Sequence, residues 1–212
     1  KQYTAATAVD GSWSLTVPAA DLADLGEANY TLNATAINAV GNGVSNTANL
    51  LVDTALPTVT INTVADDNVI NAAEVAAGQT LSGTVAHAEA GNTVTITLGG
   101  NTYTATVQND LSWSVNVSYD VLTALGNGRL SISATVTNGH GNTGSGERDV
   151  TIDANLPGLR VDTVAGDDVV NSIEHNQNLI VTGSSDGLIP GTALTVTING
   201  KTYATSVLAD GT

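Results

Sequence analysis

The chain of 212 residues carries 20 acidic side chains against 5 basic ones, a net charge of −15, and it contains no Cys, Met or Phe. Few basic side chains are present to neutralise phosphate, so nucleic-acid binding is not expected, and the lack of Cys excludes disulfides, zinc–thiolate sites and Cys nucleophiles. The hydrophobic content of 42% is too high for a disordered chain. We therefore expect a folded protein whose carboxylates serve solubility or bind hard cations such as Ca²⁺.

The sequence repeats itself at a constant offset of about 100 residues. Asp53-Thr-Ala-Leu-Pro57 recurs as Asp153-Ala-Asn-Leu-Pro157, and Ser12-Trp-Ser14 recurs as Ser112-Trp-Ser114. Tyr3, Tyr103 and Tyr203 occupy equivalent positions. A repeat of this length is the size of one immunoglobulin-like sandwich and is too long for a helical or leucine-rich solenoid unit.

The repeat boundaries are placed at the Leu-Pro segments, because Pro stops strand pairing and suits a linker. Residues 53–152 are then one complete immunoglobulin-like repeat. Residues 1–52 are the C-terminal half of a first repeat, and residues 153–212 are the N-terminal half of a third. The simplest interpretation is a segment of a longer array, and the alternative is that the two halves complement each other between molecules, as in domain swapping.

Within the complete repeat, apolar and polar residues alternate with a period of two, which is typical of half-buried strands. Seven short strands are predicted, at Val59–Val64, Thr80–Val85, Val94–Leu98, Tyr103–Val107, Trp113–Val117, Leu130–Val136 and Val150–Ile152. A short helical turn ended by Gly126 is predicted between the fifth and sixth strands, and an equivalent turn follows Pro18. The predicted fold is all-β, a tandem array of immunoglobulin-like sandwiches with Trp113 as the large core residue.

Acidic and amide side chains are predicted to gather at the junctions between repeats, because the loops of an antiparallel sandwich alternate between its two ends. At one junction the predicted set is Asp66, Asp67, Glu74, Asp153 and Asp210, and at the other it is Asp53, Asp110, Asn138 and Asn142. Crowded carboxylates repel one another unless a divalent cation joins them, and Ca²⁺ takes six to eight oxygen ligands. The alternative is that Asp, Asn and Gly occupy these turns for their backbone preferences.

The motifs Asp53-x-x-x-Pro57, Thr63–Asn71 and Asp110-x-x-Trp113, with the Asn/Gly loop at 138–142, resemble the bacterial immunoglobulin-like repeats of giant adhesins. These are surface proteins of Gram-negative bacteria exported by type I secretion, and the likeness extends to the giant non-fimbrial adhesin of Salmonella. The resemblance implies a calcium-stiffened structural segment of a secreted, surface-retained virulence protein that attaches to host cells. The implied partners are a host-cell glycan or glycoprotein, reached through the whole array, and neighbouring repeats, with no nucleic acid and no membrane insertion.

The resemblance also implies a set of calcium ligands. These are Asp53, Asp66, Asp67, Asp110, Asp153, Asp167, Asp168 and Asp210, with Asp10, Glu74, Glu174, Asn138 and Asn142 as additional candidates. Asp66 is matched by Gly166, and Asn68 is matched by Asp168, so which acid of each pair binds the ion stays open.

Other chemistry finds little support in the residues. His87, His140 and His175 do not recur between repeats, so a shared histidine metal site is not expected, and neither a nucleophile elbow nor a phosphate-binding loop is present. We do not expect an enzyme. Two alternatives to a structural spacer stay open, a distal module that binds a glycan or receptor and an accessory domain of a secreted hydrolase. Trp13 and Trp113 are predicted to be core residues rather than sugar-stacking platforms.

Overall fold

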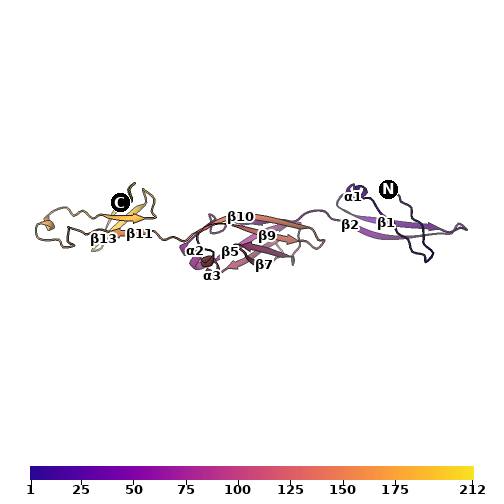
Figure 1. Ribbon diagram of the computed structural model, residues 1–212, viewed down its shortest axis with the longest axis horizontal. Helices are drawn as coiled ribbons and strands as arrows, with labels where there is room; N and C mark the ends of the chain where they lie inside the picture. The colour runs from indigo at the N-terminus through magenta and orange to yellow at the C-terminus, as the bar shows by residue number, and fades with distance from the viewer.

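The computed structural model describes all 212 residues and is drawn out along one axis. Figure 1 shows a central body joined by two extended segments to a smaller body on either side, with the N- and C-termini in the outer two. We call these parts the N-terminal body (residues 1–52), the first linker (53–57), the central body (58–152), the second linker (153–157) and the C-terminal body (158–212). No helix is long and apolar enough to cross a membrane.

The central body is a sandwich of two sheets. One sheet has five strands in the order β4-β10-β9-β6-β7, and the other has three in the order β3-β5-β8. The strands are β3 (Thr58–Ile61), β4 (Val69–Asn71), β5 (Gln79–Ala86), β6 (Thr93–Leu98), β7 (Asn101–Thr106), β8 (Ser112–Val117), β9 (Gly128–Thr137) and β10 (Thr143–Asp153). The predicted all-β sandwich class is confirmed.

The strand prediction was incomplete. The last predicted strand, Val150–Ile152, is only the end of β10, which begins seven residues earlier at Thr143. The first predicted strand ends at Ile61, and the chain then turns and forms β4, which was not predicted. β4 runs parallel to β10, with Ile70 opposite Ile152, so the sandwich is not wholly antiparallel. β4 was not predicted because its two apolar residues, Val69 and Ile70, are adjacent and do not alternate with polar ones.

Two short helices lie at the end of the central body where the second linker leaves (Figure 1). α3 (Tyr119–Leu125) is the predicted helical turn, and it ends at Gly126, whose φ of 68° lies in the region that Gly adopts easily. α2 (Ala72–Ala77) was not predicted. Its start is fixed by a capping box, in which the Asn71 side chain accepts the Glu74 N–H and the Glu74 side chain accepts the Asn71 N–H.

The hydrophobic core lies within the central body. It joins 21 buried residues from Val59 to Ile152, and Trp113 on β8 is the largest of them, with 1% of its surface exposed. Trp113 packs against β5 at Gly83, where an added Cβ would lie 2.8 Å from the indole ring and 1.8 Å from the Thr60 carbonyl oxygen. The core prediction for Trp113 is confirmed, and its neighbour has to be glycine.

The outer bodies are more open. The N-terminal body has α1 (Ala19–Ala23), which follows Pro18 as predicted, and the hairpin of β1 (Ala28–Ile37) and β2 (Gly43–Val52). The C-terminal body has β11 (Gly158–Val161), a 3₁₀ turn (Glu174–Asn176), β12 (Gly183–Asp186), β13 (Ala193–Ile198) and β14 (Lys201–Ser206). Val207 is the one buried residue outside Pro57–Ile152. Trp13 is 56% exposed, contrary to the core prediction, because no strand equivalent to β5 lies beside it.

The different surroundings of the two tryptophans give the first prediction. Trp113→Ala is expected to lower the free energy of unfolding of the central body by about 3–5 kcal/mol, because it removes the largest core side chain beside a glycine that cannot fill the space. Urea unfolding followed by circular dichroism measures this change. Trp13→Ala is the matched control, and in dilute protein it is expected to change that free energy by less than about 0.5 kcal/mol. Equal losses in the two variants would contradict the placement of the core.

Candidate functional sites at the two linkers

The first linker is held by the central body through the loop between β9 and β10. Nδ1 of His140 lies 2.7 Å from Oδ2 of Asp53, the first residue of the linker. The Asn142 side-chain amide donates a hydrogen bond to the Asp53 carbonyl oxygen, at 3.0 Å. The Asp53 side chain is 20% exposed and His140 is 47% exposed, so the contact lies at the surface beside the junction. The loop therefore binds both the side chain and the backbone of Asp53.

Asn138 shapes this loop from within. It is the one buried polar side chain of the structure, with 6% of its surface exposed. Its Oδ1 accepts hydrogen bonds from the backbone N–H groups of His140 and Asn142, at 3.1 and 2.9 Å. Its side-chain amide donates to the His87 carbonyl oxygen at 3.3 Å, which ties the loop to the opposite part of the sandwich. Asn138 thus orients His140 and Asn142 toward the linker.

The equivalent loop of the N-terminal body has the same hydrogen bonds and a different central residue. Oδ1 of Asn38 accepts hydrogen bonds from the N–H groups of Val40 and Asn42, as Asn138 does in the central body. Val40 stands where the central body has His140, so the N-terminal body has no imidazole at this position. The sequence analysis gave His140 no role. The signal that identifies it is its place in an Asn-Gly-x-Gly-Asn loop already predicted to face Asp53.

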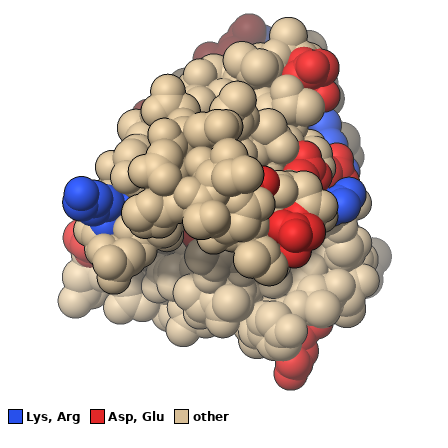
Figure 2. All heavy atoms as spheres, turned by 90° about the vertical axis from the view of Figure 1, so that its left-hand side faces the viewer, with Lys and Arg blue, Asp and Glu red and all other residues tan.

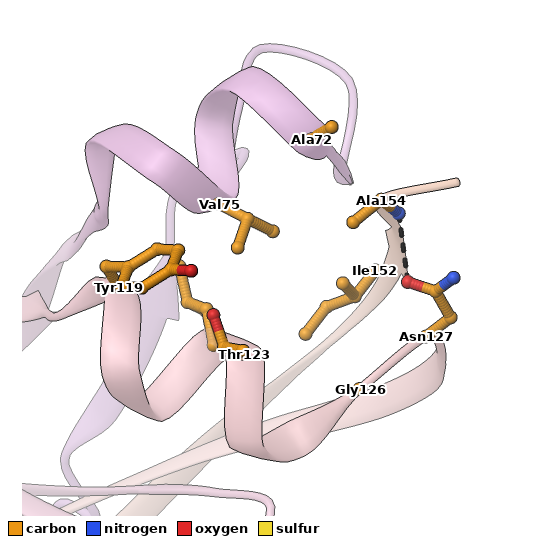
Figure 3. Close-up of a pocket in the computed structure, with 9 residues that line it drawn as sticks. Ala72, Val75, Tyr119, Thr123, Gly126, Asn127, Ile152 and Ala154 are labelled. Carbon is orange, nitrogen blue, oxygen red and sulfur yellow. Dashed lines mark hydrogen bonds between the residues drawn. The ribbon is translucent and has the colours of Figure 1, made fainter. Parts of the chain in front are cut away.

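Both linkers are also bound by the repeat that precedes them. Oε1 of Glu27 accepts hydrogen bonds from the Thr54 N–H and hydroxyl, at 2.8 and 2.5 Å. At the second linker, Oδ1 of Asn127 accepts the Ala154 N–H at 2.9 Å, the contact dashed in Figure 3, and the Asn127 amide donates to Oδ1 of Asn155 at 2.8 Å. Glu27 and Asn127 occupy equivalent positions, each directly after a Gly, at Gly26 and Gly126.

A shallow pocket of about 260 Å³ lies beside the second linker, between α2 and α3. Figure 3 shows Val75, Tyr119 and Ile152 turned toward it, with Asn127 and Ala154 at its edge. Its lining residues are Ala72, Val75, Tyr119, Leu122, Thr123, Gly126, Asn127, Ile152 and Ala154. The lining contains no charged side chain, so its chemistry does not suit a cation.

The acids of the first loop in each repeat bond within their own loop. Oδ1 of Asp67 accepts the Val69 N–H at 2.8 Å, and Oδ1 of Asp167 accepts the Val169 N–H at 3.0 Å. Oδ1 of Asp168 accepts the Val164 N–H at 2.8 Å, which is the contact that Asn68 makes with Val64. Glu74 and Glu174 cap the helical turns that follow. Asp66 accepts no hydrogen bond, so its carboxylate is free.

The turn before β8 is shaped by Asp110. Asp10 and Asp210 shape the equivalent turns of the outer bodies. Oδ1 of Asp110 accepts both the N–H and the hydroxyl of Ser112, at 3.0 and 2.6 Å, and these bonds hold the pKa of the carboxyl below its usual range. Ser12 and Thr212 lower the pKa values of Asp10 and Asp210 in the same way. The second oxygen of each carboxylate has no partner.

The structure gathers only part of the predicted calcium ligands. Asp53, Asn138 and Asn142 meet at the first junction, together with His140. Asp153 bonds locally to Asn155, the Asp66 carboxylate stays free, and the other acids bond within their loops or caps. No three His, Asp or Glu side chains are grouped so that they could hold a metal ion. The donor oxygens have the chemistry that Ca²⁺ prefers, but their arrangement falls short of the six to eight ligands it takes.

A structure of a 1.5-MDa bacterial ice-binding adhesin, studied for retention on the host cell surface, is 30% identical over 97% of this chain and 68% of its own, with a TM-score of 0.52. The chain belongs to the immunoglobulin-like repeat domains of giant bacterial adhesins.

Two further adhesin structures are similar. A Ca²⁺-stabilized adhesin that helps an Antarctic bacterium reach out and bind ice is 32% identical over 96% of this chain and 51% of its own, with a TM-score of 0.50. A bacterial immunoglobulin-like domain from the M. primoryensis ice-binding adhesin is 36% identical over 46% of this chain and 98% of its own, with a TM-score of 0.39. No family model and no curated protein matches.

These comparisons support the prediction that the chain is part of a bacterial adhesin. The similar proteins are bacterial adhesins, so the chain is a segment of a bacterial surface adhesin. The more specific likeness to the giant adhesin of Salmonella is not shown by these matches.

The contact between His140 and Asp53 gives a second prediction. His140→Ala is expected to speed hydrogen exchange of the first-linker amides, because the linker then keeps only the Asn142 bond on its downstream side. The core should be unaffected, since an exposed pair contributes only about 0–1 kcal/mol. Exchange measured by mass spectrometry on peptides that cover residues 50–58 reports the change.

His175→Ala is the matched control, because that side chain is exposed in the C-terminal body and does not bond to the first linker. Exchange that rises equally in both variants, or in neither, would show that His140 does not hold the linker.

Proposed function

We propose that the chain is a structural spacer in the repeat array of a bacterial surface adhesin, which holds a binding region away from the cell so that it reaches a host cell. The observation that carries the proposal is that the first linker is bonded to the bodies on both sides of it and the second linker is bonded to the central body. Asp53 bonds to His140 and Asn142 downstream, and Thr54 and Ala154 bond to Glu27 and Asn127 upstream. Such contacts restrict bending between successive bodies.

We further propose that the repeats divide at 53 and 153, as the sequence predicts. This division is supported by the core, which runs from Val59 to Ile152. It is also supported by the equivalent loop hydrogen bonds that Asn38 and Asn138 accept. Residues 1–52 are then the second half of one repeat, and residues 153–212 are the first half of another.

Calcium at the junctions is part of the same proposal. It is supported by the Ca²⁺-stabilized relative, by the excess of acids, and by carboxylate oxygens that have no partner at Asp66, Asp110 and Asp210. The proposed ligands remain Asp53, Asp66, Asp67, Asp110, Asp153, Asp167, Asp168 and Asp210, with Asp10, Glu74, Glu174, Asn138 and Asn142 as additional candidates. At the first junction the ion would have to compete with the His140 imidazole for Asp53.

The cellular setting is proposed from the resemblance of the sequence motifs. It comprises a Gram-negative bacterium, type I secretion, retention of the adhesin at the cell surface, a role in virulence, and attachment to a host glycan or glycoprotein through the array as a whole. Neighbouring repeats of the same chain are the direct partners of this segment.

Calcium titration tests the proposal. A ligand that binds only the folded state raises the free energy of unfolding by about 2.7 kcal/mol at a hundredfold excess over its dissociation constant. We expect a higher melting temperature in Ca²⁺ than in chelator, and a longer, narrower distance distribution by small-angle X-ray scattering. Mg²⁺ at equal concentration is the control for ionic strength. If chelator alters neither the melting temperature nor the scattering profile, junction calcium is absent.

Substitution of a linker acid tests where the ion binds. Asp153→Asn is expected to weaken the calcium-dependent rise in melting temperature, since the neutral amide is a poorer ligand for a hard cation, with affinity falling by roughly tenfold or more. Asp149→Asn removes the same charge from β10 away from the linker, where Asp149 pairs with Arg129. Calcium titrations of both variants separate a ligand from general charge, and equal responses would place the ion elsewhere.

A further inference from the structure

Basic side chains are scarce in this chain, with 5 against 20 acidic ones, and Figure 2 shows few of them on the face at its C-terminal end. Arg148 on β10 is the one that is half-buried rather than exposed. Arg129 pairs with Asp149 at the surface, whereas Arg148 has no carboxylate partner. Its guanidinium donates to two uncharged oxygens instead, through Nε to the Ile61 carbonyl at 2.7 Å and through Nη1 to Oδ1 of Asn68 at 3.3 Å. Because burial removes part of its hydration, these two bonds have to stabilise the cation.

Arg148 continues a close contact between β10 and β3. β3 is an edge strand that pairs with β5, and its other edge lies against β10. An added Cβ at Gly146 would lie 2.0 Å from the Val59 carbonyl oxygen, and Gly144 faces the last carbonyl of the first linker in the same way. The Ile61 carbonyl is the next in this series, and there β10 has Arg148. Two glycines thus let the strands touch, and the arginine holds the end of β3.

Asn68 is bonded to β10 through its backbone as well as its side chain. Its carbonyl oxygen accepts the Thr151 N–H at 2.9 Å. Its Oδ1 accepts the Val64 N–H at 3.1 Å in addition to the bond from Arg148. β4 begins at the next residue and runs parallel to β10, and its last residue lies opposite Asp153. The position of Asn68 therefore determines how β4 meets the first residue of the second linker.

The preceding repeat has different residues at these positions. β2 is equivalent to β10, and it carries Val44, Asn46 and Ala48 where β10 has its two glycines and the arginine. None of the three can supply a guanidinium, and two of them place a side chain where the central body has room only for glycine. The bridge therefore distinguishes the central repeat from the one before it.

We propose that Arg148 is the positioning residue of the second linker. Its guanidinium fixes the end of β3 and the start of β4 to one strand, and β4 in turn holds Asp153 where the chain leaves the central body. Residues 62–68 lie between these two points, so the same bonds order the first loop. The inference rests on the proposed role of the linkers as stiff connections, and it adds a contact that requires no metal ion.

The third repeat shows that an acid fits the place of Asn68. Asp168 is equivalent to it, and Oδ1 of Asp168 accepts the Val164 N–H at 2.8 Å, the bond that Asn68 makes with Val64. The backbone also agrees, with φ values of 64° and 66°. Asn68→Asp therefore keeps the hydrogen bond within the loop and changes the acceptor that faces Arg148 from neutral to charged. Hydrogen bonds between two charged groups are stronger than those to a neutral amide.

Removal of the guanidinium tests the bridge. R148Q is expected to speed hydrogen exchange of the amides in residues 62–71 and 151–156 by roughly tenfold relative to those of β6, because hydrogen bonds from a charged donor are lost. R129Q is the matched control, since it removes the same charge from an exposed pair on β9. Exchange is measured by mass spectrometry in chelator, so the result does not depend on calcium at the junctions. Equal exchange in R148Q and R129Q would overturn the proposal.

Asn68→Asp separates positioning from a general loss of packing. N68D is expected to slow exchange in the same peptides when Arg148 is present, because an ion pair forms. In R148Q/N68D it is expected to speed exchange, because the new carboxylate has no partner and shares its loop with Asp66 and Asp67. An effect of N68D with the same sign in both backgrounds would contradict the proposed bridge.

R148K gives a further test that does not depend on how well R148Q folds. Lysine keeps the charge and the aliphatic stem but lacks the planar set of donors with which Arg148 reaches Ile61 and Asn68 together. Exchange of residues 151–156 is expected to be faster in R148K than in the unaltered chain, with β6 unchanged. Equal exchange of residues 151–156 in the two chains would show that the charge alone suffices and would overturn the positioning role.

Discussion

The fold depends on the closure of one sheet over the other at Trp113. The three-stranded sheet alone has one face to bury, and β8 brings to that face the single side chain large enough to bridge the sandwich. Gly83 makes room for it, and the surrounding core consists of Val, Ile, Leu and Ala without Cys or Met. In the C-terminal body the counterpart of β5 is β12, and no strand equivalent to β8 lies beside it. β12 is shorter than β5, and Val207 is the one buried residue of that body. Closure, rather than local strand propensity, therefore decides which segments become ordered sheet.

Much of this architecture is readable from the sequence. Alternation predicted the strands that have one face in the core, and Gly126 predicted the end of α3. β10 was predicted only from Val150, because residues 143–149 contain no apolar side chain. β4 was not predicted because its two apolar residues are adjacent, although the Asn71-x-x-Glu74 capping box was a usable sign of α2. The prediction for Trp13 failed for a different reason, since its immediate sequence matches that of Trp113 and only the absence of a neighbouring sheet leaves it exposed.

The candidate sites were harder to predict because an Asp in a turn satisfies two kinds of requirement with the same atoms. Asp67, Asp110 and Asp167 use one oxygen to hold their own loop, which is the ordinary reason for Asp in a turn. The second oxygen remains, so local bonding and cation binding are compatible at one residue. The role of His140 was hard to predict for another reason, because it depends on contact with Asp53, a residue 87 positions away in the chain.

The net charge does not by itself keep successive repeats in line. At physiological ionic strength charges are screened over about 8 Å, whereas a strand of 11 residues such as β10 spans roughly 36 Å. The centres of neighbouring bodies are therefore separated by several screening lengths, and their mutual repulsion is weak. Only contacts within the junction itself act at short enough range to resist bending. The bonds that Glu27, Asn127, His140 and Asn142 make to the linkers are of this kind, and a cation shared between linker and loop acids would be another. The stiffness of such an array is thus set by a few residues at each linker. It can differ from one junction to the next, because equivalent loop positions carry different residues, such as Val40 and His140.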